Sequence, residues 1–120
     1  MNYNQSVGAF GERIASNYLA KNGCKIIDKN IKTSYKELDL IAKDNKDVLI
    51  FIEVKTRVGQ SLGKAEDMLS RRKLYNFKHA AMIYMSRRKP QFSNLRFDFV
   101  AIDIDRLKKT AKIKHFKDII

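Results

Sequence analysis

Residues 48–55, VLIFIEVK, begin with five apolar side chains and end on an acid and a base, with no turn residue between them. Five consecutive apolar residues predict a strand that is buried on both faces. Side chains two residues apart in a strand point the same way, so Glu53 and Lys55 share one face. Two charges at the end of a buried strand require a functional reason or a compensating partner.

A second strand is predicted just before this one. Residues 37–42, ELDLIA, alternate between polar and apolar side chains, and residues 43–47, KDNKD, form a polar turn. A strand, a short turn and a strand predict an antiparallel hairpin. The alternation predicts two faces for the first strand, with Glu37, Asp39 and Ile41 on one side and Leu38, Leu40 and Ala42 on the other.

The register of this hairpin determines which charges meet. A turn centred on Lys46 places Asp39 directly opposite Glu53, with their Cβ atoms ~5 Å apart. Two carboxylates at that separation repel each other unless they share a proton or bind a cation. Glu37 lies on the same face as Asp39 and makes the predicted site more acidic.

The rest of the chain predicts two helices and further strands. Apolar residues recur at helical spacing over residues 6–22 and 70–86. Residues 24–31 and 95–104 have the composition of strands; the latter follows a helix and should run parallel to the buried strand. The tail, residues 106–120, is a candidate edge strand. The order predicts an α/β fold, αβββαβ, with a mixed central sheet flanked by helices.

Composition narrows the class of protein. A chain of 120 residues with 44% hydrophobic residues predicts one folded domain over residues 1–120. The longest apolar run is five residues, far too short for a membrane span, and no signal peptide is visible at the N-terminus. Cys24 has no partner for a disulfide, so a reducing cytoplasm is expected.

The charge is concentrated in two segments. The net charge is +12; residues 64–89 contribute +6 (eight bases, two acids) and residues 106–120 contribute +5 (six bases, one acid). Such clustering is typical of a surface that binds nucleic acid, ahead of an acidic membrane face. The alternative is a solvated lysine-rich surface without a partner. RNA is less favoured than DNA, because no run of aromatic residues suggests a base-stacking platform.

Oxygen ligands without nearby histidine or cysteine favour Mg²⁺ or Mn²⁺ over zinc. Asp39 and Glu53, with Glu37, are the candidate ligands. Such a metal stabilises charge on a phosphoryl oxygen and activates water, and Lys55 could hold that water or neutralise the phosphorus centre. These are the parts needed for phosphodiester hydrolysis. The competing interpretation, a structural ion pair between Glu53 and Lys55, leaves Asp39 facing an acid without explanation.

The spacing from Asp39 to Glu53-Val54-Lys55 resembles the PD-(D/E)xK nuclease superfamily, although Leu38 stands where the superfamily's name implies proline. The segments GERIASNYLAKNG, ELDLIAKD and FIEVKTR resemble the YraN-like family of small bacterial proteins, similar in fold to archaeal Holliday-junction resolvases. The resemblance implies a restriction-endonuclease-like core and a metal-dependent endonuclease acting on branched or damaged DNA. It also implies Glu12 as a further catalytic and metal-binding residue and the Val54 carbonyl as a ligand.

Several side chains are predicted to contact the nucleic acid. If Ser70 caps the second helix, three cations occupy its first turn, where the helix dipole disfavours each by ~0.3–1 kcal/mol. Residues retained at such a cost suggest a ligand, so phosphate contacts are predicted for Arg71, Arg72 and Lys73. Arg57 is predicted as a further phosphate contact, and Thr56 is predicted to add a hydroxyl beside the site. Cleaving two strands symmetrically would require a homodimer. A module that binds nucleic acid without cutting remains the alternative function.

Overall fold

The computed structural model describes residues 3–59 and 69–120, and these ranges contain two helices and five strands. The elements in chain order are α1 (Tyr3–Lys21), β1 (Lys25–Lys32), β2 (Glu37–Lys43), β3 (Val48–Val58), α2 (Arg71–Arg88), β4 (Asn94–Asp105) and β5 (Thr110–Phe116). The element order predicted from the sequence is confirmed, and the tail contributes β5. Neither helix is long and apolar enough, over its described residues, to cross a membrane.

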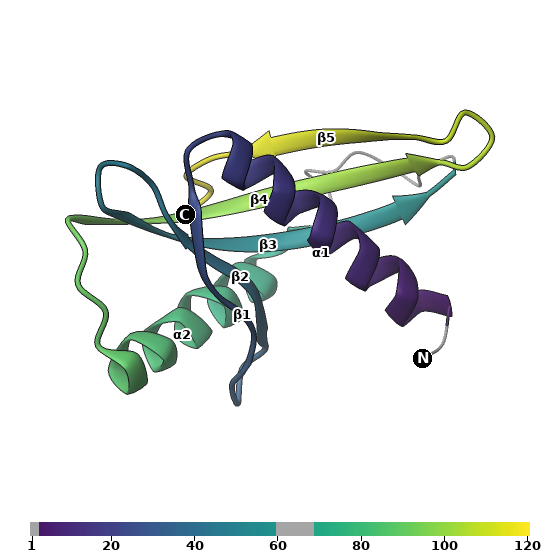
Figure 1. The fold of residues 1–120 in the computed structure, drawn as a ribbon. Coiled ribbons are helices and arrows are strands. Elements are labelled where there is room, and N and C mark those ends of the chain that lie inside the picture. The colour runs from purple at the N-terminus through teal and green to yellow at the C-terminus, as the bar shows by residue number, and fades with distance from the viewer. Residues whose placement is uncertain (1–2, 60–68) are drawn as a thin grey trace.

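The strands form a single mixed sheet in the order β1-β2-β3-β4-β5 (Figure 1). β1, β2 and β3 pair antiparallel, β4 lies parallel to β3, and β5 returns antiparallel to β4. A parallel neighbour requires a crossover connection, and α2 lies in the connection between β3 and β4. The α/β fold with a mixed sheet flanked by helices is therefore confirmed.

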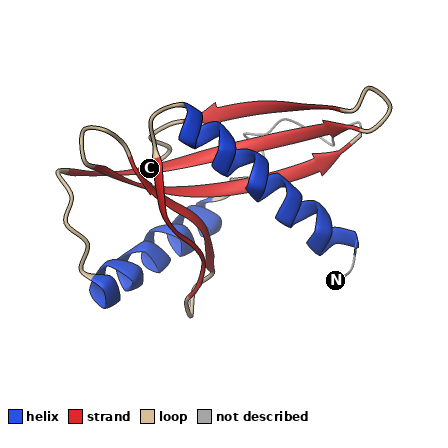
Figure 2. Ribbon diagram, in the orientation of Figure 1, coloured by secondary structure: helices blue, strands red, loops and turns tan. Residues whose placement is uncertain are grey.

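The two helices cover opposite faces of this sheet (Figure 2). α1 packs Ala15 and Leu19 on one face, which we call the α1 face. The α2 face is covered by four buried side chains of the other helix, namely Phe77, Ala80, Ala81 and Tyr84. β3 contributes to both cores, as the unbroken apolar run of residues 48–52 predicted, because its alternate side chains point into different layers.

α1 approaches β3 closely at a glycine. A Cβ added to Gly11 would lie 1.7 Å from Oγ1 of Thr56, a separation that atoms cannot tolerate. Gly11 therefore lets the helix backbone pack directly on the Thr56 side chain. This contact places Thr56 on the α1 face, whereas Glu53 and Lys55 alternate onto the α2 face.

β2 departs from the strict alternation predicted for residues 37–42. Leu38 belongs to the core beneath α2, whereas Leu40 belongs to the core beneath α1. The partner strand explains the change, because the register pairs Lys29 with Leu40 and Ile31 with Leu38. Between them, Asn30 has a φ of 52°, a left-handed conformation that interrupts the pleat. The prediction that Leu38 and Leu40 share a face is wrong, and Asp39 lies at this irregularity.

A buried polar network joins β4, β5 and α1. Asp98 is 0% exposed and accepts two hydrogen bonds from Arg96, both at 2.9 Å. It also accepts the backbone N–H of Asp118 at 3.0 Å and lies 2.8 Å from Nε2 of His115, whose Nδ1 lies 3.0 Å from the Tyr18 hydroxyl. Burial by itself would raise the pKa of Asp98, but the bonds from His115 and Arg96 lower it below its usual value. The network anchors β5 and the C-terminal segment to the sheet.

Candidate metal and nucleic-acid site

The register of the β2–β3 hairpin agrees with the prediction. Leu40 pairs with Ile52 and Ile41 with Phe51, so one further step along both strands brings Asp39 opposite Glu53. The two carboxyl groups lie close enough for the charge of Glu53 to raise the pKa of Asp39. Their proximity depends on the pairing of β2 with β3. The hairpin therefore builds a carboxylate pair where the β2–β3 ladder ends.

The backbone of β3 helps to hold this pair. The N–H of Val54 donates a hydrogen bond to Oδ2 of Asp39 at 2.8 Å, so the carboxylate takes the place of a ladder partner. In a strand, the N–H and C=O of one residue point to the same side. The Val54 carbonyl therefore points toward the same neighbour. Asp39, Glu53 and this carbonyl are three oxygen-bearing groups at one end of the hairpin.

Burial and the Glu53 charge raise the pKa of Asp39 to about 8. Burial is the larger cause, and it acts by disfavouring the ionised form. The charge of the neighbouring carboxylate raises the pKa further. The Val54 hydrogen bond and the charge of Lys36 oppose the shift without cancelling it. The raised pKa favours a proton on Asp39 at neutral pH.

Lys36 is a member of the site that the sequence reasoning missed. Its ammonium forms an ion pair with Glu53 and lies 4.9 Å from the centre of the Phe77 ring on α2. The tight turn before β2 orients it, since Oγ1 of Thr33 accepts the backbone N–H of Lys36 at 3.1 Å. Its only sequence signal was its position three residues before Asp39.

The raised pKa predicts a pH-dependent effect of replacing Asp39. Folded protein binds a proton there between the unfolded pKa, about 4, and about 8, so this carboxyl progressively destabilises the fold as pH rises through that window. Asp39→Asn removes the effect. We expect the variant to be more stable than wild type by about 1–3 kcal/mol at pH 8, and by less at pH 5. Urea unfolding in EDTA at the two pH values measures the difference.

Glu37→Gln is the matched control for this experiment, because Glu37 is an exposed acid on the same strand. Its replacement should change the free energy of unfolding little and equally at both pH values. An Asp39→Asn effect that did not grow between pH 5 and pH 8 would contradict a raised pKa at Asp39.

Glu12 and Glu37 make other contacts in the structure. Glu12 accepts a hydrogen bond from the Asn30 side chain at 2.8 Å, on the strand next to Asp39. Glu37 lies opposite Lys32 at the exposed end of β2. Across the two described ranges, no three acidic, histidine or cysteine side chains form a group able to hold a metal. The roles predicted for Glu12 and Glu37 remain predictions.

Lys55 and Arg57 continue the α2 face beyond Glu53. Lys55 is exposed, whereas Arg57 forms a two-point ion pair with Asp103 on β4, with Nε to Oδ1 at 2.8 Å and Nη2 to Oδ2 at 3.2 Å. The carboxylate orients the guanidinium at a fixed place on the sheet. Thr56, predicted beside the site, is under α1 on the other face.

The first turn of α2 is as the sequence predicted. The Ser70 hydroxyl accepts the backbone N–H of Lys73 at 3.1 Å, which makes Ser70 the N-cap. Arg71, Arg72 and Lys73 therefore form the first turn, and all three are exposed. Their contact with a phosphate remains a prediction.

β5 adds Lys112 and Lys114 to the α2 face. The sequence had predicted these lysines only as part of a basic tail. The strand registers align Lys55, Ala101 and Lys114 in one row across the sheet. The next row places Lys112 beside the Arg57–Asp103 pair. The two rows extend ~13 Å from Glu53 along the strands.

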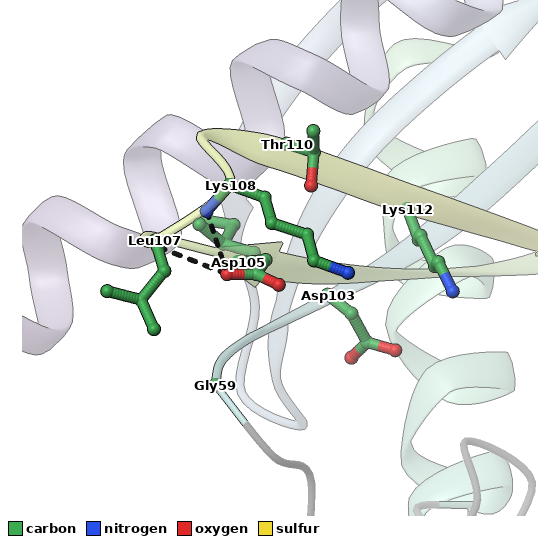
Figure 3. Close-up of a pocket in the computed structure, with 8 residues that line it drawn as sticks. Gly59, Asp103, Asp105, Leu107, Lys108, Thr110 and Lys112 are labelled. Atoms are coloured by element: carbon green, nitrogen blue, oxygen red, sulfur yellow. Dashed lines mark hydrogen bonds between the residues drawn. The ribbon is translucent and has the colours of Figure 1, made fainter.

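A hollow of about 430 Å³ lies where this face meets the β4–β5 turn. Figure 3 shows the amino groups of Lys108 and Lys112 beside the carboxylates of Asp103 and Asp105. Asp105 also accepts the backbone N–H groups of Leu107 and Lys108, both at 3.1 Å, which holds the turn. The basic rows thus end at an ordered turn.

The helix, three antiparallel strands, helix and parallel strand define an α/β protein consistent with a restriction-endonuclease-like core. The chain belongs to the family described as "Uncharacterised protein family UPF0102", which matches residues 11–102. This confirms the YraN-like resemblance at the level of the family.

Relatives match over nearly the whole chain, and each is called "UPF0102 protein". The one from Syntrophomonas wolfei is 38% identical over 112 residues, 93% of this chain and 95% of that protein. The one from Syntrophotalea carbinolica is 40% identical over 111 residues, 92% of this chain and 88% of that protein. The one from Dictyoglomus thermophilum is 37% identical over 117 residues, 98% of this chain and 96% of that protein.

Proposed function

We propose that this protein is a metal-dependent endonuclease of the PD-(D/E)xK superfamily that hydrolyses phosphodiester bonds in branched or damaged DNA. One observation carries the proposal: two carboxyl groups, Asp39 and Glu53, are held in contact at the end of a buried hairpin, and the pKa of Asp39 is raised to about 8. Such a pair is costly to the fold unless a ligand uses it.

The donor set fits a hard divalent cation. Asp39 and Glu53 would hold Mg²⁺ or Mn²⁺ with the Val54 carbonyl, and few protein ligands leave positions for water and phosphate. Glu12 and Glu37 are proposed as outer supports. When bound, the metal would supply Lewis-acid stabilisation of a phosphoryl oxygen and a more acidic water.

The protein's own side chains orient the reaction. Hydrolysis forms a bond from a water oxygen to phosphorus and breaks one phosphorus–oxygen ester bond, and the water's proton ends on the departing oxygen. Lys55 lies on the face of Glu53 and would hold the water and neutralise charge at phosphorus. Lys36 forms an ion pair with Glu53 and so balances the charge of that carboxylate. Its ammonium would also contact the phosphate.

Phosphate contacts are proposed for the cations on the same face and at the start of α2. Lys55 and Lys114 form one row across the sheet, and Arg57 and Lys112 form the next. Arg71, Arg72 and Lys73 extend this surface. Evenly spaced cations that run from the carboxylates suit a DNA backbone. A homodimer would supply two such sites for symmetric cleavage in the cytoplasm.

A second candidate function has an observation of its own. Lys36 already forms an ion pair with Glu53, which is what a structural role for that acid would require. The protein would then bind nucleic acid without cutting it. The two candidates differ in their response to a divalent metal.

The test combines metal binding with cleavage. We expect 1 mM Mn²⁺ to raise the melting temperature of the wild type by ~2–6 °C, and Asp39→Asn to remove the rise. Wild type incubated with labelled linear, flapped and four-way-junction DNA should cut in Mn²⁺ and not in EDTA. The preferred shape then names the substrate.

If the melting temperature did not respond to Mn²⁺ and no DNA were cut, the nuclease proposal would fail. Salt-sensitive DNA binding without either response would support the non-catalytic binder. Glu37→Gln, which removes only a proposed outer support on β2, should keep most of the Mn²⁺-dependent rise.

A further inference from the structure

Three aromatic rings from distant parts of the sequence meet on the surface, where the β1–β2 turn meets α2. Tyr75 and His79, one turn apart on α2, stack with centroids 4.0 Å apart and planes at 30°. Tyr35, from the β1–β2 turn, lies 5.0 Å from His79 and 6.2 Å from Tyr75. We call these three residues the aromatic trio.

A purely structural explanation accounts for only part of the aromatic trio. The rings do join the β1–β2 turn to α2. Tyr75 is nevertheless 55% exposed and Tyr35 41% exposed, so large areas of both side chains face solvent. An aromatic contact that served the fold alone would gain stability by burying this surface. The exposed aromatic area is therefore available to a ligand.

The charge around the aromatic trio indicates the kind of ligand. α2 carries six lysine and arginine residues and no acid over its whole length. Arg71 and Arg72 lie four and three residues before Tyr75, so they flank it on the helix surface. Cations recognise phosphates, and exposed rings recognise flat, unstacked bases.

The aromatic trio is also continuous with the candidate site. Tyr35 is followed directly by Lys36, whose ammonium binds Glu53 and lies over the Phe77 ring. Phe77 is on the same helix as Tyr75 and His79 but points into the core. Lys36 and α2 thus connect the aromatic trio to Glu53, so a strand whose phosphate reached Glu53 would pass near these rings.

We propose that Tyr35, Tyr75 and His79 form a stacking platform for an unpaired base of single-stranded DNA, next to the proposed cleavage site. Paired bases inside a duplex present only their edges, because their faces are covered by neighbouring bases, and only the terminal pair has an uncovered face. The platform would therefore favour DNA with an unpaired segment, such as a flap or an open junction. This substrate preference rests on the proposed function, but base binding itself does not.

The experiment measures DNA binding in EDTA, so that cleavage plays no part. Anisotropy titrations use labelled (dT)20 and a blunt 20-base-pair duplex, with wild type, Tyr75→Ala, Tyr75→Phe and Phe92→Ala. We expect Tyr75→Ala to weaken (dT)20 binding ~10-fold, since loss of one base stack costs this much, and to change duplex binding less than 2-fold. Tyr75→Phe should bind as wild type does.

Phe92 is the matched control, because it is an exposed aromatic residue (40%) outside the aromatic trio. Its replacement by alanine should leave both affinities unchanged. Quenching of tyrosine fluorescence by (dT)20 in wild type, and its reduction in Tyr75→Ala, reports the stacking directly. All three variants alter exposed positions, Tyr75 or Phe92, so the folded protein should be retained, as circular dichroism will show.

Equal weakening of single-stranded and duplex binding by Tyr75→Ala would overturn the platform, as would unchanged binding to (dT)20. These outcomes are separate from the cleavage test. A protein that cuts DNA but keeps its (dT)20 affinity in Tyr75→Ala refutes only the platform. A protein that never cuts but loses (dT)20 affinity selectively refutes only the nuclease.

Discussion

Replacing Lys55 with alanine is expected to lower kcat for DNA cleavage by about 100-fold or more, because positioned cations at a phosphoryl centre act mainly in the transition state. Lys55 is exposed on the face of Glu53, two residues along β3, so its loss removes no core packing. KM should change by less than about 5-fold. Single-turnover cleavage in saturating Mn²⁺ measures both quantities.

Lys114 provides a control of equal charge. The strand registers place Lys55 and Lys114 in one row, separated only by Ala101, and both are exposed. Lys114→Ala should weaken DNA binding and reduce its salt dependence by about one phosphate contact while leaving kcat unchanged. If both variants changed only KM, Lys55 would be a phosphate contact and would have no catalytic role.

Replacing Asp98 with alanine is expected to lower the free energy of unfolding by about 3–5 kcal/mol, because a fully buried carboxylate is removed from the polar groups that surround it. Arg96 and His115 would lose their shared acceptor, and the N–H of Asp118 would lose its partner. Because total stability is usually about 5–15 kcal/mol, Asp98→Asn serves as a milder second variant. Urea unfolding at pH 7 measures both.

Asp103 serves as a control that separates the effect of burial from the loss of an ion pair with arginine. It lies on the same strand and also binds an arginine at two points, but its side chain is 29% exposed. Asp103→Ala should cost about 1 kcal/mol. Equal losses from Asp98→Ala and Asp103→Ala would contradict a special role for the buried network.

The network also predicts a pH dependence. The pKa of Asp98 is lowered in the folded protein, so its contribution is present above the unfolded pKa of about 4 and is lost as pH falls toward the lower folded value. The difference in stability between wild type and Asp98→Asn should therefore shrink in acid.

Much of the fold was predictable because its signals are local. The apolar run of residues 48–52, the helical spacing of residues 70–86 and the polar turn between β2 and β3 each depend on neighbouring residues. The turn also set the register of the β2–β3 ladder, which ends at Leu40 and Ile52, next to Asp39 and Glu53. The exception was the face of the sheet on which Leu38 lies. The left-handed conformation of Asn30, on the neighbouring strand β1, interrupts the pleat there.

The candidate site was predictable in part for the same reason. Asp39 and Glu53 meet within one hairpin, and Ser70 is the N-cap of α2. Lys36 was missed because the turn at residues 33–36 determines which nearby lysine reaches Glu53. Arg57 was expected to contact a phosphate, and its pairing with Asp103 required the parallel register of β3 and β4.

The sequence by itself determined the order of elements, the β2–β3 register and the family, because periodicity and turn chemistry act over a few residues. Only the tertiary structure decided the contacts between distant side chains. Asp98 meets His115 through the β4–β5 pairing, and Tyr35 meets Tyr75 and His79 because α2 packs beside the β1–β2 turn. Such contacts depend on sheet twist and helix position, which are set by the packing of the whole core and not by any one segment.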